Sequence, residues 1–368
     1  MRLKIRRSLL VKEVSLLEGI VEKRSTMPIL NYLLLKAQGD SLEIQGTDLE
    51  LGGIVKIEAQ VEEGGAVTVE SSKFLSLMKD MDGEFVEIVE EEDSKIEIRC
   101  GKSNYTLFGL SPDNYPTIPL PQNEEKIVVD IDIFKSLIKA VRFSISEDQY
   151  KDVNGADFIA EGNTLSMVST DYSRLSYMKG NVEKNYGHVD FLIHKKALSE
   201  LSKMGDGGDL EILKGVNNIF FINKNKILIS RVIEGKFPDF GDYIHQSKEK
   251  KIVFKREEML KALKRICNII TSRVKVVLFE IGKGNILLNY ESAESGIGKE
   301  NLECSFMEEI FRVTFNAVYV KEFLETLSCE EVAMELNDEK SSVRFSPVGG
   351  IPLKERVFDS FYIIMPYE

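Results

Sequence analysis

At 368 residues the chain exceeds the roughly 100–200 residues of one ordinary domain, so two or three domains are expected. Hydrophobic residues make up 43% of the chain and charged residues 29%, without an extended apolar run or a biased tract, which is typical of a folded, soluble protein. The net charge of −12 argues against a uniformly DNA-attracting surface, because binding to phosphates needs an excess of Lys and Arg.

The N-terminal segment starts basic, as secretion signals do, but Lys12 and Glu13 interrupt its apolar stretch after three residues. We therefore expect no export signal and a cytoplasmic protein. No Cys-x-x-Cys pair occurs, and the pattern predicts reduced thiols rather than a zinc site or a disulfide framework. The four cysteines stand far apart, at Cys100, Cys267, Cys304 and Cys329.

Helical periodicity and capping predict six helices, which fall into three pairs. The pairs are 8–23 with 72–81, 132–144 with 195–204, and 256–270 with 318–327. The second members align without gaps, and each starts 123 residues after the previous one. In the helix at 132–144, Phe134, Leu137, Ile138 and Val141 form one apolar stripe, so one face of this helix should pack on a core. The spacing indicates an internal repeat of about 120 residues.

Alternating polarity predicts strands around each helix pair. In the first repeat these strands are 33–37, 41–45, 54–58, 86–90 and 95–100, and later counterparts are 210–213 with 219–222 and 332–336 with 342–345. The prediction is an α+β chain of three domains, each with two helices on one face of an antiparallel sheet. Linker-like segments place the domains at 1–122, 123–247 and 248–368. Chance similarity within an α+β chain is the alternative, but three matched helix pairs argue against it.

The predicted helices are basic on balance, although the whole chain is acidic. Lys135, Lys139 and Arg142 share one helix face, and Lys261 and its neighbours form a similar cluster in the third repeat. If equivalent helices face one way, these cations would line one surface suited to phosphates. Ordinary solvated helix faces are the alternative interpretation.

No catalytic motif emerges. His188, His194 and His245 have no carboxylate or cysteine partner at a familiar spacing, and the glycine-rich segments at 205–208 and 282–284 lack the remaining residues of nucleotide-binding motifs. These observations favour a binding protein that has no enzyme activity, no metal and no cofactor. The alternatives are a nucleic-acid-processing hydrolase with an unrecognised carboxylate site and a scaffold that does not bind DNA.

Several segments closely resemble the bacterial DNA polymerase III beta subunit family, the beta sliding clamps. They occur in the family's order and span the chain from near residue 20 to its end. The segments are Lys-Arg-Ser-Thr-Met-Pro-Ile-Leu-Asn at 23–31, Gly-Thr-Asp-Leu-Glu-Leu at 46–51, Ser-Thr-Asp-Tyr-Ser-Arg-Leu at 169–175, Gly-Lys-Phe-Pro-Asp-Phe at 235–240 and Ile-Ile-Met-Pro at 363–366.

The resemblance implies a head-to-tail homodimer that forms a six-domain ring, with helices inside and sheets outside. Such a processivity factor encircles duplex DNA without sequence specificity and tethers the replicative polymerase, and a separate ATP-driven clamp loader places it on DNA. At the dimer interface, Tyr105 and Leu107 of one copy should meet Ile269 and Ile270 of the other. Charge and position suggest five DNA-binding candidates, namely Arg24, Lys73, Lys151, Lys195 and Lys196.

The resemblance also implies a pocket between the second and third domains that binds a short partner peptide through apolar anchors. Its expected residues are Val153, Thr170, Tyr172, Ser173, Arg174, Leu175, Pro238, Tyr243, Asn316, Tyr319, Ser342, Ile363, Met365 and Pro366. Two departures affect the expected peptide preference. Ser173 stands where many relatives have His, and the chain ends Met-Pro-Tyr-Glu instead of the common Met-Pro-Met/Val-Arg-Leu. The pocket near Tyr367 and Asp242 is therefore expected to select a somewhat different peptide.

Overall fold

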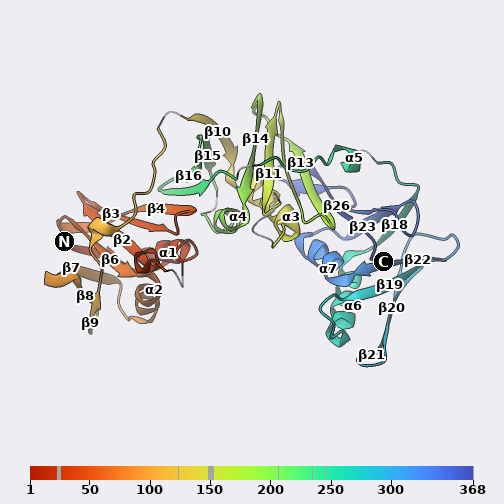
Figure 1. Ribbon diagram of the computed structural model, residues 1–368, viewed down its shortest axis with the longest axis horizontal. Coiled ribbons are helices and arrows are strands. Elements are labelled where there is room, and N and C mark those ends of the chain that lie inside the picture. The colour runs from red at the N-terminus through yellow and green to blue at the C-terminus, as the bar shows by residue number, and fades with distance from the viewer. Residues whose placement is uncertain are drawn as a thin grey trace. The chain divides into compact units, whose positions relative to one another are not determined.

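The computed structural model describes residues 1–22, 26–122, 124–147, 153–205, 207–233, 235–244 and 246–367 (Figure 1). The chain divides into two compact units, each described here by itself. The first contains residues 1–134 and 196–232, and the second contains residues 135–195 and 233–368. The middle repeat contributes to both units, so the three sequence repeats do not coincide with the compact units.

All six predicted helices are present. The observed helices are α1 (Arg7–Glu18), α2 (Ser71–Asp80), α3 (Ile131–Val141), α4 (Lys195–Leu201), α6 (Arg256–Ile269) and α7 (Ala317–Thr326), with a short α5 (Gly241–Ile244). Short 3-10 turns occupy Pro28–Asn31, Glu92–Ser94, Pro112–Asn114 and Arg142–Ser144. The last of these continues α3 to the predicted helix end at 144, and it tightens the final turn, as is common at helix C-termini.

The first unit contains two antiparallel sheets. A five-stranded sheet has the order β5-β1-β7-β8-β9, and an eight-stranded sheet has the order β10-β15-β16-β17-β4-β3-β2-β6. The strands are β1 (Arg2–Arg6), β2 (Tyr32–Gln38), β3 (Ser41–Thr47), β4 (Leu51–Glu58), β5 (Gln60–Glu63), β6 (Gly65–Glu70), β7 (Phe85–Glu90), β8 (Lys95–Cys100), β9 (Ser103–Phe108), β10 (Glu125–Asp130), β15 (Asp209–Lys214), β16 (Asn218–Asn223) and β17 (Lys226–Arg231).

The second unit also contains two antiparallel sheets. A nine-stranded sheet follows β14-β11-β12-β13-β26-β24-β23-β18, with β25 paired to β26, and a four-stranded sheet follows β21-β20-β19-β22. The strands are β11 (Gly155–Glu161), β12 (Thr164–Thr170), β13 (Arg174–Asn181), β14 (His188–His194), β18 (Lys250–Lys255), β19 (Val276–Gly282), β20 (Asn285–Ser292), β21 (Gly296–Glu303), β22 (Phe311–Asn316), β23 (Glu331–Leu336), β24 (Val343–Pro347), β25 (Ile351–Leu353) and β26 (Arg356–Ile364).

The sheets continue from one repeat into the next. Strand β4 of the first repeat pairs with β17 of the second, and β13 of the second pairs with β26 of the third. Unpaired edge strands leave backbone N–H and C=O groups without partners, and pairing across the repeats satisfies them. Two large sheets therefore run through the junctions between repeats.

Apolar helix faces build the core of each unit. In the first unit α1 packs beside α2 (Figure 1), and Leu10, Val14 and Phe74 are fully buried. In the second unit α6 packs beside α7, and Leu263 and Phe323 lie in a cluster with the strands behind them. These faces follow the helical spacing of the apolar residues in the sequence.

Ion pairs connect the first two repeats within the first unit. Lys226 of β17 lies 2.8 Å from Glu13 of α1, and both side chains are less than 10% exposed. Lys196 of α4 forms an ion pair with Asp48 and donates to the carbonyl of Ile20 at 2.8 Å. Breaking one buried pair leaves an uncompensated charge, so these contacts fix how the repeats join within this unit.

Candidate functional site

A tight turn joins β12 and β13 in the second unit, within the segment 169–175 that resembles the clamp family. Thr170 Oγ1 accepts the N–H of Tyr172 at 3.0 Å and donates to the carbonyl of Arg174 at 2.6 Å. Asp171 Oδ1 accepts the N–H groups of Ser173 and Arg174. Tyr172 takes a φ of 70°, a left-handed conformation that strains a bulky residue. The turn thus holds the Tyr172 ring 59% exposed on the surface.

The first repeat contains the same turn 123 residues earlier. Thr47 Oγ1 donates to Leu51 and accepts from Leu49, whose φ is 77°. Asp48 Oδ1 accepts the N–H groups of Glu50 and Leu51, as Asp171 does in the second repeat. The two Thr-Asp segments in the sequence therefore encode one backbone structure, built by side-chain acceptors that replace backbone partners.

A cavity of about 170 Å³ opens beside the second turn, within the second unit. Nine of the fourteen residues expected in the pocket line it, namely Thr170, Tyr172, Ser173, Arg174, Leu175, Pro238, Tyr243, Ile363 and Met365. Three further lining residues, Phe237, Asp239 and Phe240, were missed. They belong to the motif at 235–240, so the sequence did contain a signal for them.

The other five expected residues do not line the cavity; they are Val153, Asn316, Tyr319, Ser342 and Pro366. Val153 is fully buried in the apolar cluster that contains Leu175 and Ile363. Asn316 caps α7 by accepting the Val318 N–H. Val153 therefore packs behind the floor of the cavity, and Asn316 stabilises the start of α7.

Arg174 is the cation in the cavity lining, and each of its three guanidinium nitrogens donates a hydrogen bond. Nε bonds Asp171 at 2.9 Å, Nη1 bonds Glu322 at 2.5 Å and Nη2 bonds the Phe143 carbonyl at 2.7 Å. The Tyr319 ring lies 4.0 Å below the guanidinium carbon. Burial lowers the pKa of Arg174, but Tyr362, Glu322 and Asp171 outweigh this effect and hold the pKa above its ordinary value. Arg174 thus joins the second and third repeats, and each of its three guanidinium nitrogens is bonded within the protein.

The lining of the cavity is mainly apolar and aromatic. Leu175, Phe237 and Ile363 form a buried floor, whereas Tyr172 and Tyr243 are 59% and 46% exposed. An apolar hollow with a few polar groups at its edge can hold apolar side chains of an extended peptide.

Three predicted DNA-binding lysines carry ion pairs. Lys73 bonds Glu70 at 2.5 Å and is 75% exposed, and that hydrogen bond raises the pKa of Lys73. Lys195 pairs with Glu147, and Lys196 pairs with Asp48 at the repeat junction. Arg24 and Lys151 lie outside the described residues. The charges of the described lysines are partly compensated within the protein.

The other cations on the helices differ between the repeats in whether they form ion pairs. Lys261, Lys264 and Arg265 of α6 are paired with Glu257, Glu325 and Glu300. In contrast, Lys139 of α3 and Arg142, which follows it, form no ion pair with any residue that the structure describes. Among the described residues, positive charge without an ion-pair partner therefore remains at the end of α3.

The expected interface residues lie at or beneath sheet edges. Tyr105, on the edge strand β9, is 50% exposed, and Leu107 is half-buried. Ile269 is half-buried under Gly298 of the edge strand β21, where a Cβ atom would come within 2.7 Å of it. Ile270 is only 3% exposed and belongs to the core of the second unit.

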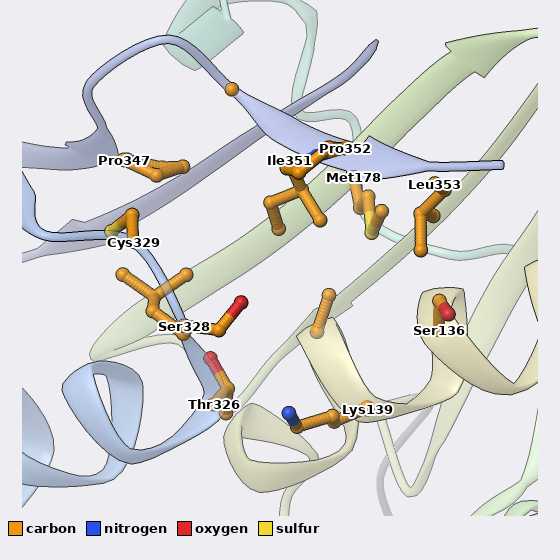
Figure 2. A pocket seen from close by; sticks show the side chains of 13 residues that line it. Ser136, Lys139, Met178, Thr326, Ser328, Cys329, Pro347, Ile351, Pro352 and Leu353 are labelled. Carbon is orange, nitrogen blue, oxygen red and sulfur yellow. The ribbon is translucent and has the colours of Figure 1, made fainter. Parts of the chain in front are cut away.

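A separate cavity of about 190 Å³ lies between the end of α7, α3 and the β25 hairpin (Figure 2). Thr326 and Ser328 lie on one side, and Ser136 and Lys139 come from α3. This cavity contains none of the residues predicted for the pocket.

The described residues contain neither a metal-binding cluster nor a membrane-spanning helix. His188 lies 3.6 Å from Glu161 on the neighbouring strand with both side chains exposed, and His245 lies outside the described residues. Within the described ranges, no group of three His, Cys, Asp or Glu residues could hold a metal ion. No described helix is long and apolar enough to cross a membrane.

Comparison with known proteins gives one match to each repeat. Residues 1–119, 128–239 and 243–359 match the models of the N-terminal, central and C-terminal domains of the DNA polymerase III beta subunit. The chain is 27% identical to the "Beta sliding clamp" of Vibrio cholerae over 372 residues, covering 100% of this chain and 99% of that protein. It is likewise 27% identical to the "Beta sliding clamp" of Escherichia coli K12 over 370 residues, with the same coverage.

Solved structures show the same fold. The crystal structure of a DNA polymerase III beta subunit from Eubacterium rectale aligns with a TM-score of 0.88 at 25% identity, covering all of both chains. The beta subunit from Thermotoga maritima aligns with a TM-score of 0.91 at 21% identity, covering 100% of this chain and 99% of that one.

Proposed function

The chain belongs to the DNA polymerase III beta subunit family of sliding clamps, and from this premise we propose that two copies close head to tail around duplex DNA. As a member of that family, the protein is a non-catalytic processivity subunit. We further propose that it acts in the cytoplasm, where it would hold the replicative polymerase on DNA after a clamp loader has placed it there.

The main support for the proposed ring is that the edge strands of successive repeats pair with one another. Strand β9 of the first repeat corresponds to β17 of the second, which lies 123 residues later, and β26 is their counterpart in the third repeat. Likewise, strand β4 of the first repeat corresponds to β13 of the second, and β21 is their counterpart in the third repeat. Because β4 pairs with β17 and β13 with β26, the same rule pairs β21 of one copy with β9 of the next.

The same rule also gives a register for the pairing between copies. Leu228 of β17 lies opposite Gly53 of β4, and a Cβ at Gly53 would collide with Leu17 and Ile20 of the first repeat. Tyr105 corresponds to Leu228. Gly298 corresponds to Gly53, since it too lies directly over isoleucines.

This correspondence places Tyr105 of one copy opposite Gly298 of the other, close to Ile269. Such an asymmetric contact gives either a closed ring or an open filament, and family membership favours closure with two copies.

DNA contact in this proposal depends on the backbone charge of DNA, which carries no sequence information. The cations without internal ion pairs, Lys139 and Arg142, join the five predicted DNA-binding residues as candidates. Lys196 is the weakest of those five, because its ammonium group already bonds Asp48 and the Ile20 carbonyl.

The partner pocket in this proposal is the cavity beside Tyr172. Its apolar floor and exposed tyrosines support binding of a short segment with apolar anchors. Family membership supports DNA and a polymerase as the partners.

The central experiment measures retention on DNA. The full-length protein would be loaded onto nicked circular plasmid by the clamp loader of the same cell and then separated from free protein by gel filtration. We expect retention on the circle and loss after a restriction enzyme linearises it. Loss from intact circles at the same rate would contradict encirclement.

The dimer interface can be tested separately. Leu107→Arg places a charge on the proposed interface, and we expect the dimer to dissociate at least about tenfold more readily in sedimentation equilibrium. Leu120→Arg is the matched control, because Leu120 is an exposed leucine, 58% accessible, away from β9. Equal dissociation constants for the two variants would argue against β9 as the interface.

A further inference from the structure

A second hollow lies next to the candidate pocket on the nine-stranded sheet. It encloses about 570 Å³, and its lining includes Tyr177, Lys179, Arg344, Asp359 and Phe361. Positions 175, 177 and 179 of β13 alternate onto one sheet face, as do 363, 361 and 359 of the paired strand β26. Leu175 and Ile363 line the pocket, so the two hollows lie along one track of side chains.

The two hollows also share their apolar floor. Tyr177 and Phe361 lie with their ring centres 5.0 Å apart, and Phe240 lies 5.9 Å from Tyr177. The same buried cluster contains Leu175 and Ile363 from the pocket. A peptide anchored in the pocket can therefore extend along the sheet across these rings.

Arg344 in the second hollow is a cation that forms no ion pair with any residue the structure describes. Its Nη1 makes one long hydrogen bond of 3.4 Å to the Ile244 carbonyl, and its guanidinium carbon lies 4.2 Å from the Phe361 ring centre. Its Nε is buried and has no hydrogen-bond partner among the described residues. A buried donor without a partner is unfavourable, which suggests that another group satisfies it.

The charges around Arg344 leave it uncompensated. Glu335 lies opposite it on β23 but pairs with Lys251 at 3.8 Å. Asp359 lies opposite Lys179 in the β13–β26 register. On the side of Ser342, Lys248 is a further cation; burial lowers its pKa, and Arg344 adds to that effect while Asp338 opposes it.

We propose that this hollow, centred on Arg344 and Lys179, is an anion-binding subsite for glutamate or aspartate side chains of a partner segment anchored in the neighbouring pocket. The assignment rests on the proposed peptide-binding function and adds to it the chemistry of the flanking residues. Arg344 would form a charge-assisted hydrogen bond to the carboxylate, and Lys179 would add attraction at the exposed side.

Geometry and charge set the spacing between the apolar anchor and the acidic residues of the segment. Four residues along β13 separate Leu175 from Lys179, which corresponds to about 13 Å at 3.3 Å per residue. The acidic residues should therefore lie about four residues from the apolar anchor. Asp239 lines the pocket but not the hollow, and it disfavours an acidic side chain directly at the anchor.

The test uses fluorescein-labelled synthetic peptides and the full-length protein. Each peptide carries a Leu-Leu-Phe anchor and, three to five residues away on either side, three glutamates or three glutamines. We expect the better glutamate peptide to bind about fivefold or more tightly than its glutamine match at low salt in fluorescence anisotropy. That preference should shrink at about 0.5 M salt, because exposed charges are screened.

Substitutions test whether the preference for the glutamate peptide arises from the subsite. Arg344→Met should abolish the glutamate preference and leave the glutamine peptide's affinity unchanged, whereas Arg344→Lys should retain part of the preference. Lys255→Met, on strand β18 of the same sheet but paired with Glu330 and Glu331, is the matched control and should keep it. If Arg344→Met does not fold, Lys179→Met provides the second test and should weaken the preference.

The outcomes separate the two proposals. Equal binding of glutamate and glutamine peptides by the unaltered protein would overturn the anion subsite and leave the peptide pocket standing. Failure of every anchored peptide to bind would overturn the pocket itself. An unchanged preference in both Arg344→Met and Lys179→Met would also overturn the subsite.

Discussion

At the scale of single residues, Arg174 shows how one side chain supports the candidate pocket. Sequence reasoning placed it in the pocket, and it does line the cavity. Its guanidinium, however, is bound to Asp171, Glu322 and Phe143, so its role is to support the pocket. The sequence can thus predict that a residue lies at a site. Its role there still depends on partners that lie far away in the sequence.

We predict that Arg174→Met destabilises the second unit by about 2–4 kcal/mol, because it leaves Asp171 and Glu322 without their cation in a partly buried setting. The free energy of unfolding in urea measures the effect. Arg231→Met is the control, since Arg231 and Glu50 are both more than 60% exposed and such pairs contribute less than about 1 kcal/mol. Similar losses in the two variants would contradict the supporting role of Arg174.

At the scale of elements, the strand pairs that cross the repeat junctions determine the architecture. Gly180 of β13 shows how closely β26 is packed there, because a Cβ at this position would come within 2.0 Å of the Phe358 ring. The Phe358 side chain is fully buried, so it has little room to move. Only glycine fits this strand position without displacing the ring.

We predict that Gly180→Val lowers the free energy of unfolding by about 1–3 kcal/mol through overpacking between β13 and β26. Lys179→Val, one residue earlier on the opposite face of the strand, should change stability by less than about 0.5 kcal/mol. Thermal and urea unfolding of both variants would measure this difference. A stable Gly180→Val protein would show that β26 can shift at this junction.

At the scale of the whole molecule, charge distribution matters more than net charge. The chain carries a net charge of −12, yet Lys139 and Arg142, which lie on and directly after one helix, form no ion pair with the residues that the structure describes. Acidic residues elsewhere can repel stray nucleic acid while such cations hold the enclosed duplex. The proposed ring needs only this local surface to retain DNA.

We predict that the double variant Lys139→Glu, Arg142→Glu leaves circular DNA several-fold faster than the unaltered protein at about 0.1 M salt, with a smaller difference at higher salt. Lys251→Glu, Arg312→Glu changes the same number of charges on strand β18 and strand β22 and should have little effect. Filter retention of loaded circles over time would measure both. Equal rates would remove α3 from the proposed DNA surface.

The sequence by itself determined the repeat, the helices and most strands, because apolar periodicity and turn residues act locally. The helix at 318–327 needed only neighbouring residues to be predicted. The Thr-Asp turns at 47 and 170 were not predicted, although neighbouring residues build them as well. Nine pocket residues followed from motifs shared with a known family. Phe237, Asp239 and Phe240 stood in one of those motifs and were still missed.

Only the tertiary structure decided which strands join across repeats and which charges remain free. Pairing of β4 with β17 and of β13 with β26 unites edges that lie far apart in the chain, and periodicity within one strand cannot identify its partner. The same holds for the cations: Lys196 and Arg344 look alike in sequence, but the first bonds Asp48 and the second has no carboxylate. Whether two charges form an ion pair depends on the distance between them in the folded protein. The sequence therefore shows which residues are charged but not which of these charges are paired.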